Sequence, residues 1–169
     1  VALENASLYE AARREAERAT ALLEFSRALS SADGLEAVCD RIGELSAATL
    51  GSPNASVWWQ ETPGGEVRVQ ATYGYTELDR ERLARKVFTH EEAAELLTKK
   101  EPFVVEKELE AVIAPMKLDG GRLGCIAVTL PDGIEFGERQ LRLLAGIAHQ
   151  SKLALTNAGN FDTLERTFL

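Results

Sequence analysis

Cysteine and histidine are the side chains best suited to covalent or acid–base chemistry, and both are scarce in this chain. The two cysteines, Cys39 and Cys125, lie far apart, so they form neither a metal-ligand spacing nor a disulfide framework. The two histidines, His90 and His149, are equally isolated. Carboxylates alternate with Arg and Lys in helix-like segments, and no catalytic triad, metal cluster or phosphate loop stands out. These patterns predict a module without a catalytic or metal site.

Small-molecule binding is the chemistry that the sequence favours, and one segment indicates where it would occur. Within residues 123–130, Cys125 and Ala127 fall on one face of a strand, whereas Ile126 and Val128 fall on the other. Bulky residues normally fill the side of a sheet that packs on helices, so the small face leaves room for a cavity.

The candidate ligand-binding residues are the aromatic residues of neighbouring segments, one histidine at a predicted helix start, and the small-face cysteine. Each aromatic residue has an alternative role as plain core, and the histidine has one as an exposed first-turn residue. These residue types do not select a particular ligand or cofactor. The candidates are Trp59, Tyr73, Phe88, His90, Phe103 and Cys125.

The elements that position these residues are mostly strands. Alternating or β-branched runs predict strands at 55–61, 67–73, 103–105, 111–118 and 122–130, with turns at Pro63–Gly65 and Asp119–Gly121. Helix-like segments gather at the two chain ends. The predicted class is therefore α+β, with a central antiparallel sheet of five or six strands covered on one face by the terminal helices.

Four helices are predicted before the last strands of the sheet. Residues 6–29 contain nothing that breaks a helix, and a second helix follows Asp33, a predicted N-cap, and ends at Gly51. Between Gly74 and Pro102, Thr76 with Asp79 and Thr89 with Glu92 predict the N-caps of two short helices. An excursion of this length is typical of binding elements and lids.

The last helix, which follows Phe136 and Gly137 and runs to Leu169, carries two apolar stripes. Leu141, Leu144, Ala148 and Leu155 form one, suited to covering a sheet. The second follows the 4-3 spacing of a coiled-coil seam and predicts a parallel homodimer. Its alternative role is to pack on the helix of residues 6–29 in the same chain. The predicted dimer seam is Leu143, Ile147, Phe161, Leu164 and Phe168.

Charge and hydropathy exclude several partners. The net charge of −8 and the pI near 4.9 disfavour nucleic acid and anionic membranes, which reward clustered Lys and Arg. No apolar run approaches the ~18 residues of a membrane span. With two unpaired cysteines, a reducing cytoplasm is the expected location.

One phrase occurs twice: Val1–Glu10 (VALENASLYE) matches Leu153–Asp162 (LALTNAGNFD). A self-match at about one domain's separation is typical of repeated modules. The first copy is then expected to be the tail of an upstream module. The predicted organisation is a linker helix at 1–30, a sensor domain at 31–158 and a helix extension at 159–169.

The order of these segments resembles a GAF domain from residue 22 onward. The most specific stretch is Val112–Met116 with the turn at Asp119–Gly120, followed by Leu123–Val128, Phe136 and a long helix ending in Asn157-Ala158. Met116 stands where this family usually has Leu. The resemblance implies a small-ligand sensor with a cavity opposite the helices, although the cyclic-nucleotide, bilin and haem signatures of the family are not assembled here.

Together these features predict a regulatory module of a signalling protein that is not itself an enzyme. Its terminal helices are expected to relay ligand binding to adjacent domains of the same polypeptide, ending in an HD-type phosphodiesterase, a diguanylate cyclase or a kinase. The alternative is a ligand-free module that serves only dimerisation and spacing.

Overall fold

A five-stranded antiparallel sheet forms the middle of the molecule. The computed structural model describes residues 1–105, 111–131 and 136–168, with side chains as far as residue 160. The strands are β1 (Ala55–Gln60), β2 (Val67–Tyr73), β3 (Phe103–Val105), β4 (Ala111–Lys117) and β5 (Leu123–Thr129). Their order across the sheet is β2-β1-β5-β4-β3, and every neighbouring pair is antiparallel. The α+β class and the strand positions are confirmed.

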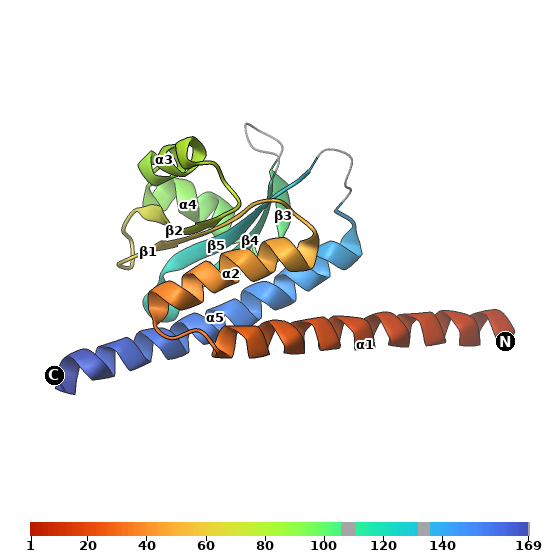
Figure 1. The fold of residues 1–169 in the computed structure, drawn as a ribbon. Helices are drawn as coiled ribbons and strands as arrows, with labels where there is room; N and C mark the ends of the chain where they lie inside the picture. The colour runs from red at the N-terminus through yellow and green to blue at the C-terminus, as the bar shows by residue number, and fades with distance from the viewer. Residues whose placement is uncertain (106–110, 132–135, 169) are drawn as a thin grey trace.

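Helices cover both faces of this sheet, in unequal numbers (Figure 1). The long helices α1 (Ala2–Ser30), α2 (Leu35–Leu50) and α5 (Glu138–Phe168) lie on one side, which we call the helical face. The short helices α3 (Glu77–Arg85) and α4 (His90–Leu97) lie on the other, the outer face. Within the described residues, no helix is long and apolar enough to cross a membrane.

The main core lies between the sheet and the long helices. Ile42 of α2, Ile126 of β5 and Leu144 of α5 are fully buried there, at 0% exposure. Burial of each such side chain contributes about 1.5–3 kcal/mol. The predicted alternation of β5 is confirmed, because Ile126 and Val128 join this core whereas Cys125 and Ala127 face outward.

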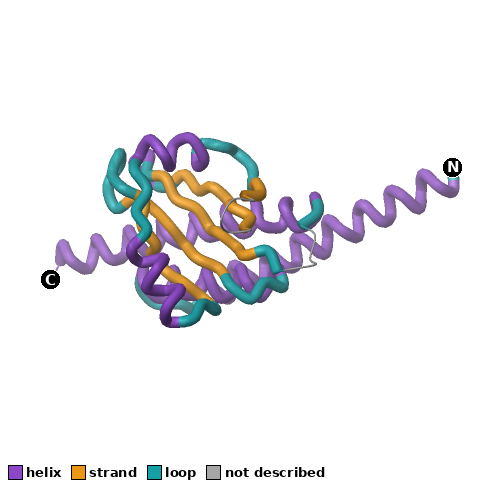
Figure 2. The backbone as a smooth tube through the Cα atoms, turned by 90° about the horizontal axis from the view of Figure 1, so that it is seen from above, coloured by secondary structure: helices purple, strands orange, loops and turns teal. Residues whose placement is uncertain are grey.

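Helices α1 and α5 run side by side in the same direction. Glu17 binds Arg139 at 3.1 Å between the side-chain atoms, and further along Leu22 lies over Gly146. Because the two helices are offset along their length, the N-terminus and the C-terminus leave the domain at opposite ends (Figures 1 and 2).

This packing corrects the predicted dimer seam. Ile147 is fully buried in the core of its own chain, so it cannot contact a second copy. Leu143 is half-buried against the same core and borders a hollow beside α1. For these two residues the intrachain alternative holds. The side chains of Phe161, Leu164 and Phe168 lie outside the described residues.

The helix ends follow the expected capping chemistry at three of the four sites. Thr76 and Thr89 cap α3 and α4 by accepting the backbone N–H groups of Asp79 and Glu92. Gly51 ends α2 in the left-handed conformation, with φ of 66°. The predicted cap Asp33 is wrong by one residue, because Gly34 is the N-cap of α2 and has no side chain to accept a bond.

Candidate functional site on the outer face of the sheet

Strand register decides which side chains reach the outer face. Trp58 pairs directly with Cys125, and Trp59 pairs with Gly124. Directly paired residues project from the same face of a sheet, so Trp58 shares the outer face with Cys125. The outer cluster, as we call the buried apolar side chains there, consists of Trp58, Val67, Leu83, Ala93, Leu97, Leu123 and Cys125.

Two of the predicted ligand-binding residues lie on the wrong face. Trp59 is buried in the helical core. Tyr73 pairs with Ala55, another residue of that core, and its Cβ lies beside Gly43 of α2. The expectation that Trp59 and Tyr73 line a cavity next to Cys125 is therefore wrong.

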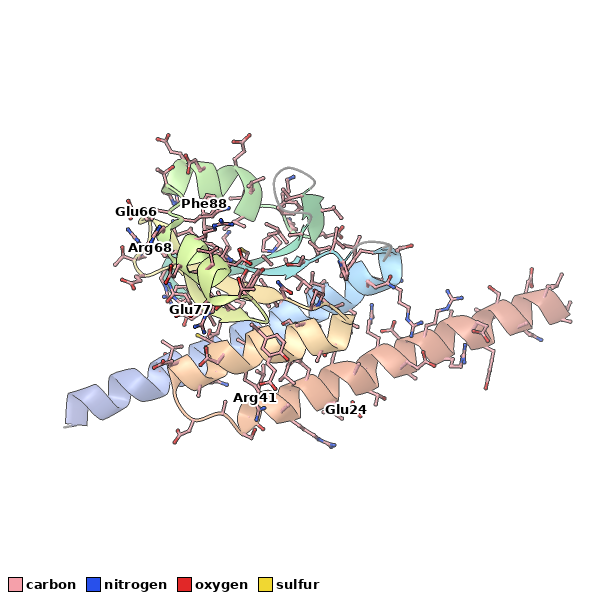
Figure 3. All side chains as sticks on the ribbon, turned by 45° about the horizontal axis from the view of Figure 1, so that its top comes forward. Glu24, Arg41, Glu66, Arg68, Glu77 and Phe88 are labelled. Atoms are coloured by element: carbon pink, nitrogen blue, oxygen red, sulfur yellow. The ribbon has the colours of Figure 1, made fainter. Side chains whose placement is uncertain are left out.

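The other candidates do lie on the outer side. Phe88 packs edge-to-face on Trp58, with ring centroids 5.7 Å apart. Figure 3 shows Phe88 on the side of the sheet away from Glu24 of α1. Phe103 pairs with Ile113, which packs on the outer cluster, and the Nζ atom of Lys99 lies 4.3 Å from the Phe103 ring centroid.

Gln60 joins these elements through its side-chain amide and is completely buried. Its Oε1 accepts the backbone N–H of Leu123 at 2.8 Å, and its Nε2 donates to the Gly65 carbonyl at 2.7 Å. The same Nε2 lies 2.8 Å from Nδ1 of His90. Because Oε1 is committed to Leu123, Nδ1 of His90 is the acceptor, and the neutral ring carries its proton on Nε2.

The start of α4 is therefore attached to the sheet at three points. The ring of Phe88 packs on Trp58, and the ring of His90 accepts from Gln60. Between them, the backbone of Phe88 exchanges two hydrogen bonds with Val67, of 2.8 and 3.1 Å. Phe88 and His90 remain exposed on their solvent sides, so these contacts border the outer cluster and do not lie inside it.

Further polar groups lie on the outer face among the apolar ones. Nε1 of Trp58 donates to Oγ of Ser56 at 2.7 Å, which satisfies the buried indole. The hydroxyl of Tyr75 meets that of Thr129 at 3.3 Å. A surface of aromatic rings with a few fixed polar groups is typical of small-molecule sites.

Neither cysteine has the environment of a reactive thiol. Burial raises the pKa of the Cys125 thiol to about 12. Burial, with a smaller contribution from Asp40, also raises the pKa of the Cys39 thiol to about 12. Both thiols are protonated at neutral pH and are poor nucleophiles. In the part of the chain that the structure describes, no group of three His, Cys, Asp or Glu residues is arranged to hold a metal ion.

The outer cluster is closed in this structure. Cys125 is 5% exposed, and α4 covers it through Ala93 and Leu97. Two open hollows, of about 510 and 380 Å³, lie instead beside α1 and α5. Access of a ligand to Cys125 therefore requires movement of α3 and α4.

Sequence reasoning missed Trp58 and Gln60. Both lie on the same face of β1 as Ser56, and the two polar residues Ser56 and Gln60 on one face of a buried strand are a signal that could have identified this face. Adjacent tryptophans gave no indication of which one faces outward, because that depends on the register with β5.

The sequence matches no protein-family model and no curated protein, whereas the fold matches solved structures. The GAF domain of a putative sensor histidine kinase from Pseudomonas syringae pv. tomato aligns with a TM-score of 0.69 and 16% identity, over 95% of this chain and 99% of that one. The GAF domain of an Acinetobacter phosphoenolpyruvate-protein phosphotransferase aligns with a TM-score of 0.68 and 12% identity, over 85% of this chain and 95% of that one.

A third similar structure is an enzyme. Free methionine-R-sulfoxide reductase from Neisseria meningitidis, in complex with its substrate, gives a TM-score of 0.65 and 11% identity, over 85% of this chain and 90% of that one. At these identities the likeness establishes the architecture and not the activity. The chain therefore has the fold of a GAF domain.

Proposed function

We propose that this chain is a regulatory GAF domain that binds a small molecule on the outer face of its sheet and relays the event through α1 and α5. The observation that carries the proposal is that adjacent residues of β1 pack in the two different layers of the molecule. Trp58 packs in the outer cluster with residues of α3 and α4, and its neighbour Trp59 packs in the core shared with the long helices. A shift of β1 would therefore change the packing on both faces of the sheet.

Binding would proceed by a change in the attachment of α4. In the closed structure, Trp58–Phe88 and Gln60–His90 hold α4 against the sheet. A ligand that inserts beside Cys125 must replace these contacts, so it binds the open arrangement better than the closed one. Such a difference in affinity is what allows a ligand to shift a conformational equilibrium.

The relay would use the helical layer. The core formed by β1 and β5 is continuous with α2 and α5, and close-packed cores transmit small displacements. We place the linker helix at residues 1–30, the sensor domain at 31–158 and the helix extension at 159–169. The output domain in the parent protein would be a kinase, an HD-type phosphodiesterase or a diguanylate cyclase, and the sensor-kinase origin of one similar structure supports this class.

The proposed partners are adjacent domains of the same polypeptide and a second copy of the chain. Because Ile147 is buried, the proposed dimer contacts lie in the part of α5 beyond the domain. There Phe161, Leu164 and Phe168 continue the 4-3 spacing. The acidic charge argues against nucleic acid and anionic membranes as partners. The two free thiols suit a cytoplasmic location.

The module itself is proposed to be non-catalytic. Reduction of methionine sulfoxide by thiols needs cysteines that approach one another and ionise. Cys39 lies on α2 and Cys125 on the outer face of β5, and each has a pKa of about 12. The present arrangement does not offer that chemistry.

The second candidate is a ligand-free spacer. The closed outer cluster favours it, because a site that is already filled by its own side chains needs no ligand for stability. Under this hypothesis α3 and α4 are a fixed cover, and only the helical layer is functional.

Native mass spectrometry of the protein purified from its own host separates the two candidates. The sensor hypothesis predicts an extra non-covalent mass of a few hundred daltons that is lost on denaturation. The spacer hypothesis predicts the bare polypeptide mass under every growth condition tested.

A further inference from the structure

The first turns of α1 form an apolar surface that nothing in the domain covers. Residues 1–9 are all exposed, including Leu3 at 87%, Leu8 at 68% and Tyr9 at 70%. Ala11 is the first residue of α1 that borders the smaller hollow, which Leu143 of α5 also lines. Figure 1 shows this end of α1 extending well beyond the sheet.

The packing of the matching phrase in α5 shows what such a surface contacts. Four positions are identical between the two phrases: Ala2 and Ala154, Leu3 and Leu155, Asn5 and Asn157, Ala6 and Ala158. In α5, Leu155 is 5% exposed in the helical core, and Ala154 and Ala158 pack against that core. Asn157 lines the larger hollow, opposite Leu29 and Val38.

Of the four identical positions, Ala154, Leu155 and Ala158 therefore pack on the helical core, and Asn157 is exposed beside the larger hollow. The exposed Asn160 corresponds to Leu8, and Thr156, which is half-buried like Ala154 and Ala158, corresponds to Glu4. The match also ends at Glu10, immediately before α1 meets the start of α5 in its own domain. The phrase thus has the length and pattern of a docking segment.

The direction of the helices allows the two phrases to be equivalent in space. Because α1 and α5 are parallel and leave the domain at opposite ends, the α5 of one module can continue without a turn as the α1 of the next. The shared helix would be roughly 65–70 Å long at 1.5 Å per residue.

We propose that Ala2, Leu3 and Ala6 form a docking surface for a preceding module of this same fold. That module would bury Leu3 as this one buries Leu155, against its own counterparts of Leu29 and Val38. This inference rests on the proposed role as one module in a series, but not on ligand binding. It makes α1 a helix shared by two domains, with residues 1–10 serving the first and residues from Ala11 onward serving the second.

A segment exchange in the full chain tests the equivalence. Replacing residues 153–162 with the sequence of residues 1–10 returns the same residues to positions 154, 155, 157 and 158. We expect the melting temperature to stay within about 3 °C of the wild type. The matched control inserts residues 11–20, another helix-forming segment, and places the residue type of Arg13 at the buried position 155. The control should melt about 8 °C lower or more. Equal losses in the two variants would overturn the proposal.

A fused protein tests the docking itself. In it, residues 1–152 are followed directly by residues 1–169, so that the second Leu3 occupies the Leu155 site of the first module. Leu3→Glu in the second module should lower the calorimetric transition of the first by about 8 °C or more, whereas Leu8→Glu, at the position of exposed Asn160, should not.

The same substitutions in the single chain provide the reference. There, Leu3→Glu should change neither the melting temperature nor the mass in solution, because Leu3 is exposed. Dissociation of a dimer by Leu3→Glu in the single chain would assign the surface to a second copy and overturn the proposal. Indistinguishable effects of Leu3→Glu and Leu8→Glu in the fused protein would also overturn it. None of these readouts depends on a ligand, so failure of the sensor role would leave this test intact.

Discussion

Single residues determine which side of the sheet each candidate faces, as an irregularity in β2 illustrates. In β2, the register with β1 shifts opposite Val57 and Trp58, so that Gln70 is an extra residue. This bulge puts Tyr73 on the helical face although Val67 and Val69 face outward. Strict alternation over residues 67–73 would place Val67, Val69, Ala71 and Tyr73 on one and the same face. A single sequence does not show where a bulge occurs, so the face of Tyr73 could not be predicted from the alternation alone.

Gln60 contributes more to the outer face than His90 does, because two of its three hydrogen bonds go to Leu123 and Gly65 and only one goes to His90. Replacing Gln60 with Met keeps the volume but leaves the Leu123 N–H and the Gly65 carbonyl without their partner. We expect a loss of about 1–3 kcal/mol in the free energy of unfolding, measured by urea denaturation.

His90→Ala is the matched control for Gln60→Met. It removes only one bond, at an exposed ring, and should cost about 0.5–1.5 kcal/mol. If His90→Ala cost as much as Gln60→Met, the bonds of Gln60 to Leu123 and Gly65 would contribute nothing to stability, and the role assigned to Gln60 would be wrong.

At the scale of elements, strands and caps were predictable because their signals are local. The Thr76 and Thr89 caps, the Asp119–Gly121 turn and the alternation of β5 each depend on a few neighbouring residues, and each is confirmed. The role of the second stripe of α5 was not predictable in the same way. Its 4-3 spacing fits a partner helix from the same chain as well as one from another chain, and Ile147 and Leu143 pack in the core of their own chain.

The close contact between α1 and α5 provides a test of that packing. A Cβ at Gly146 would lie 2.5 Å from Cδ1 of Leu22, so Gly146→Leu should force α1 away from α5. We expect a loss of about 1–3 kcal/mol and faster amide exchange along α1.

Gly43→Ala in α2 is the contrasting variant. Its new Cβ would lie 3.5 Å from Cβ of Tyr73, an ordinary contact, and the substitution should stabilise the helix by about 0.5–1 kcal/mol. Gly146→Leu with unchanged stability and unchanged exchange in α1 would contradict the intrachain packing.

At the scale of the whole molecule, two long parallel helices pack beside a sheet core and leave it at opposite ends. The resemblance stated from the sequence implied this architecture, and the comparison of folds confirms it. The ligand and the oligomeric state depend on contacts with other molecules, which the pattern of a single chain specifies weakly.

Dimerisation is tested beyond the domain, where it would not disturb the core. Replacing both Phe161 and Phe168 with Glu should give a monomer with an unchanged melting temperature, because like charges would meet along a coiled-coil seam. Light scattering after size exclusion measures the mass. A dimer of unchanged mass would exclude this seam.

The central claim is that ligands bind on the outer face and not on the helical one. Cys125→Phe and Ile126→Ala test it most directly, because adjacent residues of β5 face opposite sides. Cys125→Phe fills the outer face and should abolish the bound mass seen by native mass spectrometry, at a cost of about 1–3 kcal/mol in stability. Ile126→Ala should cost about 2–5 kcal/mol yet keep the bound mass. Loss of the ligand in Ile126→Ala together with its retention in Cys125→Phe would contradict the account and place the site beside the long helices.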